Sequence, residues 1–340
     1  NEDHSFFRFN NLLDALPTIN KIYSLNYYQT SLYSSTYNND YKEFFVNTYS
    51  NAISYRNRLI TAQSNNILFE TLMGIKYILA NDNVPIGYTL IKEEDRFGIY
   101  QNRNVFPLGY AIDNVMSYEE FNKLQYPYKL DVLLNNVIVE GTSKKEVLSS
   151  IKPIDLDYTM IIGDNLEIKK EENKYIVNAQ KTDTISLKLS EKISDKILFV
   201  KFDVLKSPSC NKGDLSIDIN GISNKLTCRS WMYHNQNYTF EYTISSPLDI
   251  DQLNIKFSKG EFEITNIETF IMDYNDVIKA TQKIDKMVVD MDKTKGDFIK
   301  GTINTNKDGY LVLTIPYDKG FEIKLNGEKQ EYERVNNGFI

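Results

Sequence analysis

The stretch from Arg229 to Tyr242, RSWMYHNQNYTFEY, places aromatic rings among polar side chains. Ring faces stack on the C–H faces of sugars, and neighbouring polar groups hydrogen-bond to the hydroxyls. If the stretch is a strand, alternation puts Trp231 and Tyr233 on one face and His234 on the other. We take these three residues as glycan-binding candidates. The alternative is that alternate rings point into a hydrophobic core.

A second group of hydroxyls lies between Ile19 and Tyr41, where tyrosines are interspersed with serine and threonine. The whole chain has 24 Tyr against 1 Trp, and tyrosine surfaces often bind polar ligands. The candidates in this stretch are Tyr27, Tyr28 and Tyr33. Compositional drift in an AT-rich genome would also produce many tyrosines, and so would a loop that packs through its own hydrogen bonds.

Motifs for catalysis and metal binding are absent from the sequence. It has no glycine-rich dinucleotide motif, no P-loop and no G-x-S-x-G elbow. There are two histidines, His4 and His234. Two aspartates at i and i+2 of a strand face the same side and could hold a cation, but such pairs are common by chance in an acidic chain. The three pairs are Asp155 with Asp157, Asp249 with Asp251, and Asp290 with Asp292. We therefore expect no catalytic residue, no metal site and no cofactor.

The two cysteines, Cys210 and Cys228, flank the pair Asn220-Gly221, which is a strong signal for a two-residue hairpin. A hairpin centred there brings Cys228 opposite Gly213, close to Cys210. We predict a disulfide between them, which would stabilise the fold by about 3 kcal/mol and imply an oxidising, extracytoplasmic compartment. The alternative is two separate buried thiols.

Length and charge limit the class of protein. A chain of 340 residues exceeds one ordinary core, and its net charge of −7 comes from mixed acidic and basic residues, without the basic patch of a nucleic-acid-binding protein. No apolar run is long enough to cross a membrane. The chain begins at Asn1 and stops at Ile340 within an expected strand. We expect both ends to be cuts in a longer protein.

The pattern of apolar residues changes near Pro153. Residues 1–152 mix helical and strand periods, with helices expected at 41–50, 65–74 and from Ser117 as N-cap, and strands between them. Residues 153–275 contain about eight short strands with regular spacing, which is typical of a jelly-roll-like β-sandwich. Residues 274–284 read as a connector with a single helical turn. We therefore predict an α+β fold: an N-terminal mixed α/β domain (1–152), an all-β sandwich (153–275) and a smaller C-terminal β unit (276–340).

Four segments in order resemble the YfhO family of bacterial membrane proteins. They are LYSSTYNNDYKEF, LMGIKYILA, IYQNRNVFPLGYAIDN and the terminal GYLVLTIPYDKGFEIKLNGEKQEYERVNNGFI. The match covers the first 120 residues and the C-terminal end, and the central sandwich fits by position. No single segment is diagnostic; their order and spacing fit the family's extracytoplasmic region.

The resemblance implies a polytopic C-class glycosyltransferase that uses polyprenyl-phosphate sugars, with some members linked to teichoic acids of Gram-positive envelopes. The family's catalytic carboxylate lies in an early membrane loop, so no catalytic residue is carried onto this chain. The leading expectation is a non-catalytic extracytoplasmic region that sits over its own transmembrane domain. There it would guide a cell-envelope glycan or teichoic acid acceptor. The alternatives are a scaffold that braces the membrane part or binds a partner, and an independent carbohydrate-active enzyme.

Overall fold

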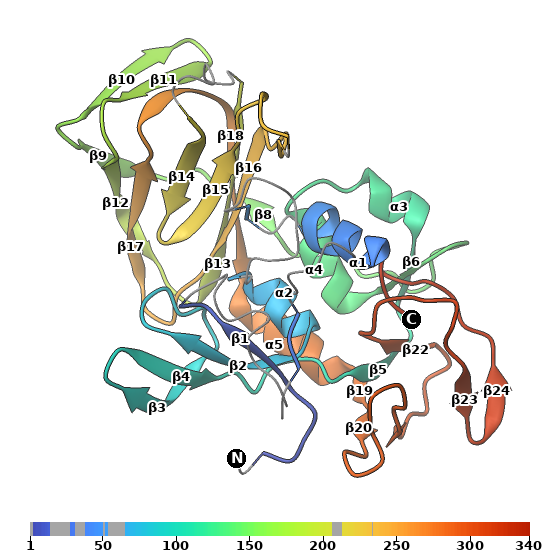
Figure 1. The fold of residues 1–340 in the computed structure, drawn as a ribbon. Helices are drawn as coiled ribbons and strands as arrows, with labels where there is room; N and C mark the ends of the chain where they lie inside the picture. Colours follow the sequence, from blue (N-terminus) through green and yellow to red (C-terminus); the bar gives the residue numbers. More distant parts are fainter. Residues whose placement is uncertain are drawn as a thin grey trace.

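The computed structural model describes residues 3–13, 28–30, 38–49, 52–53, 65–205, 213–232 and 234–340. The described part is rich in β-strands and carries few helices (Figure 1). Its buried apolar residues form two clusters, one in the N-terminal region and one inside a β-sandwich.

A four-stranded sheet lies at the N-terminal end, with strand order β1-β2-β4-β3. The strands are β1 (Arg8–Asn11), β2 (Ile75–Ala80), β3 (Thr89–Glu94) and β4 (Phe97–Gln101). β1 runs parallel to β2, and the other pairs are antiparallel. The strands expected between the helices of residues 1–152 are thus confirmed in β2, β3 and β4.

Short helices contribute side chains to the hydrophobic core of the N-terminal region. They are α1 (Asn39–Glu43), the π-helix η1 (Phe44–Thr48), α2 (Ile67–Leu72), α3 (Tyr118–Lys123) and α4 (Tyr128–Asn135). Ser117 caps α3 as predicted, since its side chain accepts a hydrogen bond from the Glu120 N–H. α2 ends at Leu72, and Gly74 follows it with φ +65°; a Cβ on Gly74 would lie 2.5 Å from the Phe106 carbonyl oxygen. Only glycine both adopts this positive φ without strain and leaves room for the carbonyl oxygen.

Two facing sheets form the β-sandwich. One contains β10 (Leu166–Glu171), β11 (Lys174–Ala179), β18 (Gly260–Asp273), β13 (Lys196–Val204) and β16 (Thr239–Ile244), with β8 (Lys152–Pro153) beside β18. The other contains β15 (Ile222–Leu226), β14 (Leu215–Ile219), β17 (Ile250–Phe257), β12 (Asp183–Ile193) and β9 (Tyr158–Ile162). The predicted hairpin turn is confirmed: Asn220 and Gly221 have φ 48° and 86°, as a type I′ turn requires. The jelly-roll topology stays a prediction.

β13 explains how the N-terminal region and the sandwich fit together. Its apolar run ILFV (197–200) is buried throughout, because both faces of the strand are covered there. Leu198 and Val200 enter the sandwich core, whereas Ile197 and Phe199 enter the N-terminal core. The Tyr126 hydroxyl also donates a 2.6 Å hydrogen bond to the Tyr242 carbonyl across this junction.

The segment after the sandwich was predicted wrongly as a connector with one helical turn. It is the ten-residue helix α5 (Tyr274–Lys283), capped by Asp273. Val277 and Ala280 are buried in the N-terminal core. Because these positions are three apart on one helical face, the packing stabilises a helix that looks mostly polar in sequence.

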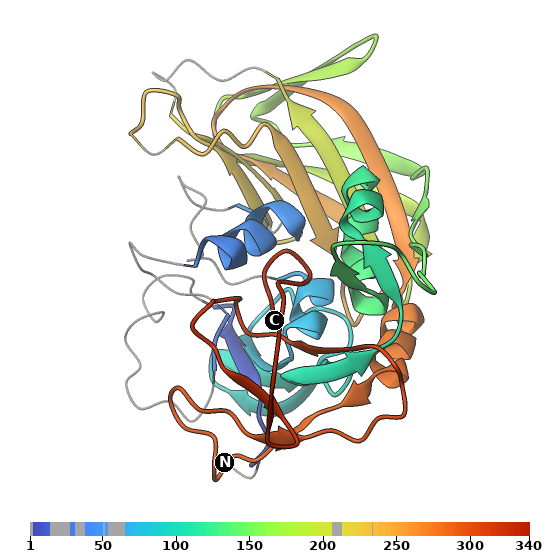
Figure 2. The same cartoon turned by 90° about the vertical axis from the view of Figure 1, so that its right-hand side faces the viewer.

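The C-terminal residues pack into the N-terminal region. β5 (Gly109–Ile112) lies between β19 (Asp285–Lys286) and β22 (Tyr310–Leu313), while β6 (Val115–Ser117) pairs with β7 (Val137–Val139). Two small hairpins complete the chain: β20 (Val288–Val289) with β21 (Gly301–Thr302), and β23 (Ile323–Leu325) with β24 (Glu328–Gln330). Phe339 is fully buried against Phe44, with ring centroids 4.5 Å apart. Figure 2 shows the C-terminal segment lying across this region. Residues 276–340 therefore share the N-terminal core. The domain limits at 152 and 275 stay predictions.

Candidate functional site

Lys76 and Tyr77, consecutive in β2, have side chains on the same face of the sheet because the strand is irregular there. Arg8 pairs with Ile75 and the next residue, Phe9, pairs with Tyr77, so Lys76 has no counterpart in β1. An extra residue of this kind redirects a side chain that strict alternation would send to the core. Both side chains are partly exposed, whereas Ile75 is fully buried.

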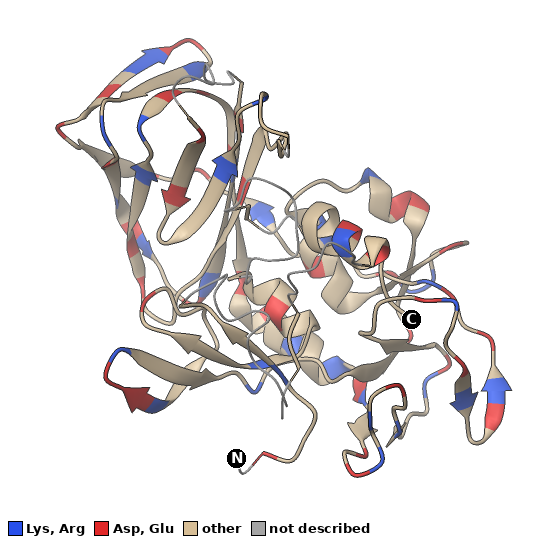
Figure 3. Ribbon diagram, viewed as in Figure 1, with Lys and Arg blue, Asp and Glu red and all other residues tan. Residues whose placement is uncertain are grey.

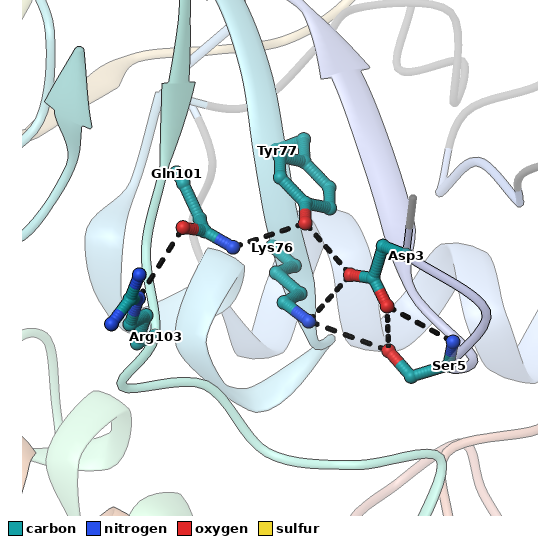
Figure 4. Close-up of polar contacts among 6 residues, drawn as sticks. All are labelled: Asp3, Ser5, Lys76, Tyr77, Gln101 and Arg103. Carbon is teal, nitrogen blue, oxygen red and sulfur yellow. Dashed lines mark hydrogen bonds and ion pairs between the residues drawn. The ribbon is translucent and has the colours of Figure 1, made fainter. Parts of the chain in front are cut away.

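The carboxylate of Asp3 lies where these two side chains converge (Figure 4). Its Oδ2 accepts hydrogen bonds from Lys76 Nζ at 2.6 Å and from the Tyr77 hydroxyl at 2.7 Å. Its Oδ1 accepts from the Ser5 backbone N–H at 2.9 Å and from the Ser5 hydroxyl at 2.6 Å. Four donors thus fix one carboxylate at the start of the chain.

The network continues from Tyr77 across the sheet to β4. Gln101 Nε2 donates to the Tyr77 hydroxyl at 3.0 Å, and Arg103 Nε donates to Gln101 Oε1 at 3.3 Å. Tyr77 and Gln101 face each other directly in the antiparallel ladder. The network therefore ends in an exposed guanidinium, which has further N–H groups for an anionic or hydroxyl-rich ligand.

The electrostatics of the network follow from these contacts. Burial opposes ionisation of Asp3, but the hydrogen bonds from Lys76, Ser5 and Tyr77 outweigh it and hold the pKa of Asp3 well below its usual range. Burial, together with the hydrogen bond to Asp3 and its negative charge, raises the pKa of Tyr77 to about 12. At neutral pH the face therefore presents a carboxylate, an ammonium, a guanidinium and a neutral phenol.

Aromatic rings border this network. The Phe7 ring packs edge-on against Tyr77 with centroids 4.9 Å apart, and Lys76 Nζ lies 5.6 Å from the Tyr77 ring centroid. We call the set Asp3, Ser5, Phe7, Lys76, Tyr77, Gln101 and Arg103 the polar–aromatic face. It combines a ring with fixed donors and acceptors, which is the chemistry that binds sugars.

Buried Arg8 anchors the strand that follows Asp3, Ser5 and Phe7. Its guanidinium donates to the carbonyl of Met73 at 2.5 Å, and to the hydroxyl and carbonyl of Thr314 at 2.9 and 2.6 Å. Burial lowers the pKa of Arg8 to about 10, so it remains charged at neutral pH. Among the described residues no carboxylate forms an ion pair with it. Arg8 thus ties three distant parts of the chain together.

Among the predicted site residues that the structure describes, Tyr28 lies nearest this face. It is 42% exposed, bridges to Arg8 beside β1, and stacks on Phe6 with centroids 4.6 Å apart. Phe6 does not belong to the polar–aromatic face. Tyr28 therefore lies beside that face, at the edge of the sheet. The other two candidates of this stretch, Tyr27 and Tyr33, lie outside the described residues.

The expected strand through Trp231 is wrong, because β15 ends at Leu226 and β16 begins at Thr239. The residues between them form a loop in which Asn235 and Asn237 are buried. Asn235 accepts from the Thr227 N–H and donates to the Lys225 carbonyl, and such contacts compete with strand pairing.

Trp231 and His234 both lie on the surface of this loop. Trp231 is 47% exposed, and His234 Nδ1 lies 3.3 Å from the Trp231 carbonyl oxygen. Tyr233 lies outside the described residues. Both ribbon views place the loop at the end of the sandwich far from β1 and β2 (Figures 1 and 2). The structure therefore does not bring Trp231 and His234 together with Tyr28.

Cys228 is disulfide-bonded. Its N–H also lies 3.4 Å from Asp214 Oδ1, beside Gly213, as the predicted hairpin register requires. The predicted partner, Cys210, lies outside the described residues, so the pairing stays a prediction.

Two carboxylates with raised pKa values, those of Glu70 and Asp131, are buried away from the polar–aromatic face. Glu70 in α2 is fully buried. This burial raises the pKa of Glu70 to about 8. Burial likewise raises the pKa of Asp131 in α4. Within the described ranges no three or more His, Cys, Asp or Glu side chains group in a way that could hold a metal ion.

Sequence reasoning missed most of the polar–aromatic face. Asp3 and Tyr77 are far apart in the chain, and no short motif links them. The available signal was weak: Lys76 is a charged residue inside the apolar run IKYILA, which indicates an exposed position in that strand.

Comparison with protein families shows the family to which the chain belongs. The family model described as bacterial membrane protein YfhO matches residues 1–340. The chain belongs to the YfhO family. Among curated proteins, it is 24% identical over 344 residues to the uncharacterized protein YfhO of Bacillus subtilis (strain 168). The match covers 94% of this chain and 37% of that relative, so the chain spans little more than a third of it.

Two solved structures are weakly similar to this YfhO-family chain. A mutant family 29 carbohydrate-binding module, studied for its ligand recognition, shares 12% identity over 37% of this chain and 93% of the module, with a TM-score of 0.23. A peptidoglycan O-acetylesterase shares 8% identity over 78% of this chain and 43% of the esterase, with a TM-score of 0.18. At these scores neither structure bears on function. No helix in the described ranges has the length and apolarity needed to cross a bilayer.

Proposed function

We propose that this chain is the extracytoplasmic, non-catalytic region of a polytopic, glycosyltransferase-like membrane protein. It guides a cell-envelope glycan or teichoic acid acceptor towards the transmembrane domain of the same protein. The group that transfers the sugar belongs to a part of the protein outside this chain. The parent enzyme takes a polyprenyl-phosphate sugar as donor, and it acts in the cell envelope of a Gram-positive bacterium.

The observation that carries the proposal is the polar–aromatic face. An exposed guanidinium, an ammonium and an amide lie on one sheet beside an aromatic ring, and the hydrogen bonds to Asp3 and Gln101 hold them in place. Preorganised donors lower the entropy cost of binding a polar polymer. A teichoic acid offers hydroxyls and phosphates to such donors, and a neutral glycan offers hydroxyls and C–H faces.

The disulfide at Cys228 supports the extracytoplasmic location. Disulfides persist in oxidising compartments outside the cytoplasm and are rare within it. Figure 3 shows Lys and Arg interspersed with Asp and Glu along the described ribbon.

Calorimetric titration of the 340-residue chain with purified wall teichoic acid, lipoteichoic acid and peptidoglycan fragments tests the proposal. We expect saturable binding of at least one polymer. Arg103→Ala should weaken it about tenfold, as for loss of one charged contact. Arg96→Ala is the matched control, because Arg96 is exposed at the β3–β4 turn of the same hairpin. It should bind like the wild type.

Absence of binding to every polymer would overturn the acceptor role, provided that the full-length protein stays active when these residues are deleted. Loss of activity without polymer binding would instead favour a second candidate: a scaffold that braces the membrane part. One observation favours that role. The hairpin β20–β21 and the turn within it expose Val288 (67%) and Phe298 (57%), which are apolar side chains suited to a protein contact.

A further inference from the structure

Strand β9 ends the five-stranded sheet, with β12 on one side and no further described strand in the ladder. Its sequence YTMII has no charge, no proline and no glycine. Yet its large apolar side chains are exposed, from 36% for Tyr158 to 62% for Ile161. Natural sheet edges usually carry charges or proline that prevent another strand from pairing. β9 itself has neither.

The hydrogen bonds to β12 show which peptide groups face outward. Gly163 N donates to the Thr184 carbonyl, and Ser190 N donates to the Asp157 carbonyl. In an antiparallel pair, alternate residues direct both peptide groups to the same neighbour. The odd-numbered residues of β9 therefore face β12. The N–H and C=O groups of Tyr158, Met160 and Ile162 face the open edge.

The same three residues have side chains on the core side of the sheet, because each lies opposite a buried residue of β12. The pairs are Tyr158 with Leu189, Met160 with Leu187, and Ile162 with Ile185. These three side chains extend the apolar surface of the sandwich core to the edge strand β9. A strand added at this edge would gain backbone hydrogen bonds and cover an apolar row in one step.

The charges that flank β9 indicate which segment fits. Asp157 precedes the strand and Asp164 follows it, and both are exposed. If β9 of two copies paired antiparallel about Met160, Asp157 of one copy would face Gly163 of the other, next to Asp164. Like charges in such positions disfavour pairing. Lysine or arginine at both ends of an incoming strand would complement them.

We propose that the open edge of β9 binds an extended peptide segment of another protein. That segment has alternating apolar side chains and basic residues at both ends. It adds as a sixth strand beside β9, with its apolar side chains against Tyr158, Met160 and Ile162. This interaction surface is distinct from the polar–aromatic face and does not depend on glycan binding.

A peptide titration of the 340-residue chain, followed by fluorescence anisotropy, tests the proposal. The probe is a labelled seven-residue peptide in which valine and threonine alternate between two terminal lysines. A second peptide replaces both lysines with glutamate. We expect the lysine peptide to bind about tenfold more tightly than the glutamate peptide. Hydrogen exchange should slow at the amides of Tyr158, Met160 and Ile162.

Two variants with the same substitution separate the edge from the rest of the strand. Ile162→Lys places a charge in the apolar row and should weaken binding about tenfold or more. Ile161→Lys changes a similarly exposed residue on the other face and should bind like the wild type. Equal loss in both variants, equal affinity for the two peptides, or no binding would overturn the proposal. So would light scattering that shows a dimer lost in Ile162→Lys, since a second copy would then be the partner.

Discussion

Tyr77 donates a hydrogen bond to Asp3 across 2.7 Å and accepts one from Gln101 across 3.0 Å. Its phenol is therefore the central link between the N-terminal segment and the β3–β4 hairpin. The link exists because β2 carries one residue more than β1 at this point. The irregular strand thus creates the face that we propose for ligand binding.

Tyr77→Phe should disconnect Asp3 from Gln101 while it keeps the ring packed on Phe7. We expect a loss of about 1 kcal/mol in unfolding free energy, typical of one hydrogen bond, and roughly fivefold weaker polymer binding. Denaturant unfolding and calorimetry measure the two effects. Tyr100→Phe, in the adjacent strand β4 but outside the network, is the control. If it reduced binding as much as Tyr77→Phe, the network would not be the cause.

Glu70 should make the fold less stable as pH rises. Its folded-state pKa of about 8 lies above the ordinary value of 4.5. Between these values the unfolded chain releases a proton that the folded chain retains, so unfolding becomes easier. Thermal unfolding from pH 4 to 9 measures this trend, which amounts to the order of a few kcal/mol.

The variant Glu70→Gln cannot ionise, so its stability should vary less with pH across the same interval. At pH 8.5 it should exceed the wild type in melting temperature. If the stability of both proteins changed with pH to the same extent, Glu70 would not titrate in this range.

Arg8→Met should destabilise the fold by about 3 kcal/mol or more, because the carbonyls of Met73 and Thr314 lose their buried donors. The exposed Arg96 is the matched position, and Arg96→Met should change stability by less than about 0.5 kcal/mol. Urea unfolding curves measure both. Equal, small effects would mean that Arg8 does not anchor β1.

The partner of Cys228 can be identified by peptide mapping without reduction. We expect one cross-linked peptide that contains Cys210 and Cys228. Cys210→Ser and Cys228→Ser should each cost about 3 kcal/mol, and the double variant should cost no more than either. A cross-link between two chains, or alkylation of either thiol without reductant, would contradict the predicted pairing.

Local patterns predicted the fold where local chemistry decides it. Asn220-Gly221 indicated the turn, Ser117 indicated the helix cap, and the spacing of apolar runs indicated the strands of the sandwich. Local patterns did not predict the elements whose structure depends on packing against distant residues or on side-chain hydrogen bonds to the backbone. α5 forms because Val277 and Ala280 meet a core built by the N-terminal region. The stretch around Trp231 stays out of the sheets while Asn235 and Asn237 bond to the backbone.

The candidate site was predictable only in part. A tyrosine-rich N-terminal region led to Tyr28, which lies beside the polar–aromatic face. Asp3, Lys76 and Gln101 could not be found, because their contact depends on an irregularity of β2 and on pairing between strands distant in the chain. The YfhO family match shows the family to which the chain belongs, and it does not show which residues bind a ligand.

The most direct test of the acceptor role is an NMR titration of the isotope-labelled 340-residue chain with purified teichoic acid. We expect saturable shifts centred on the amides and side chains of Phe7, Tyr77, Gln101 and Arg103. Shifts confined to the loop around Trp231 and His234, or no shifts with any envelope polymer, would contradict the acceptor role.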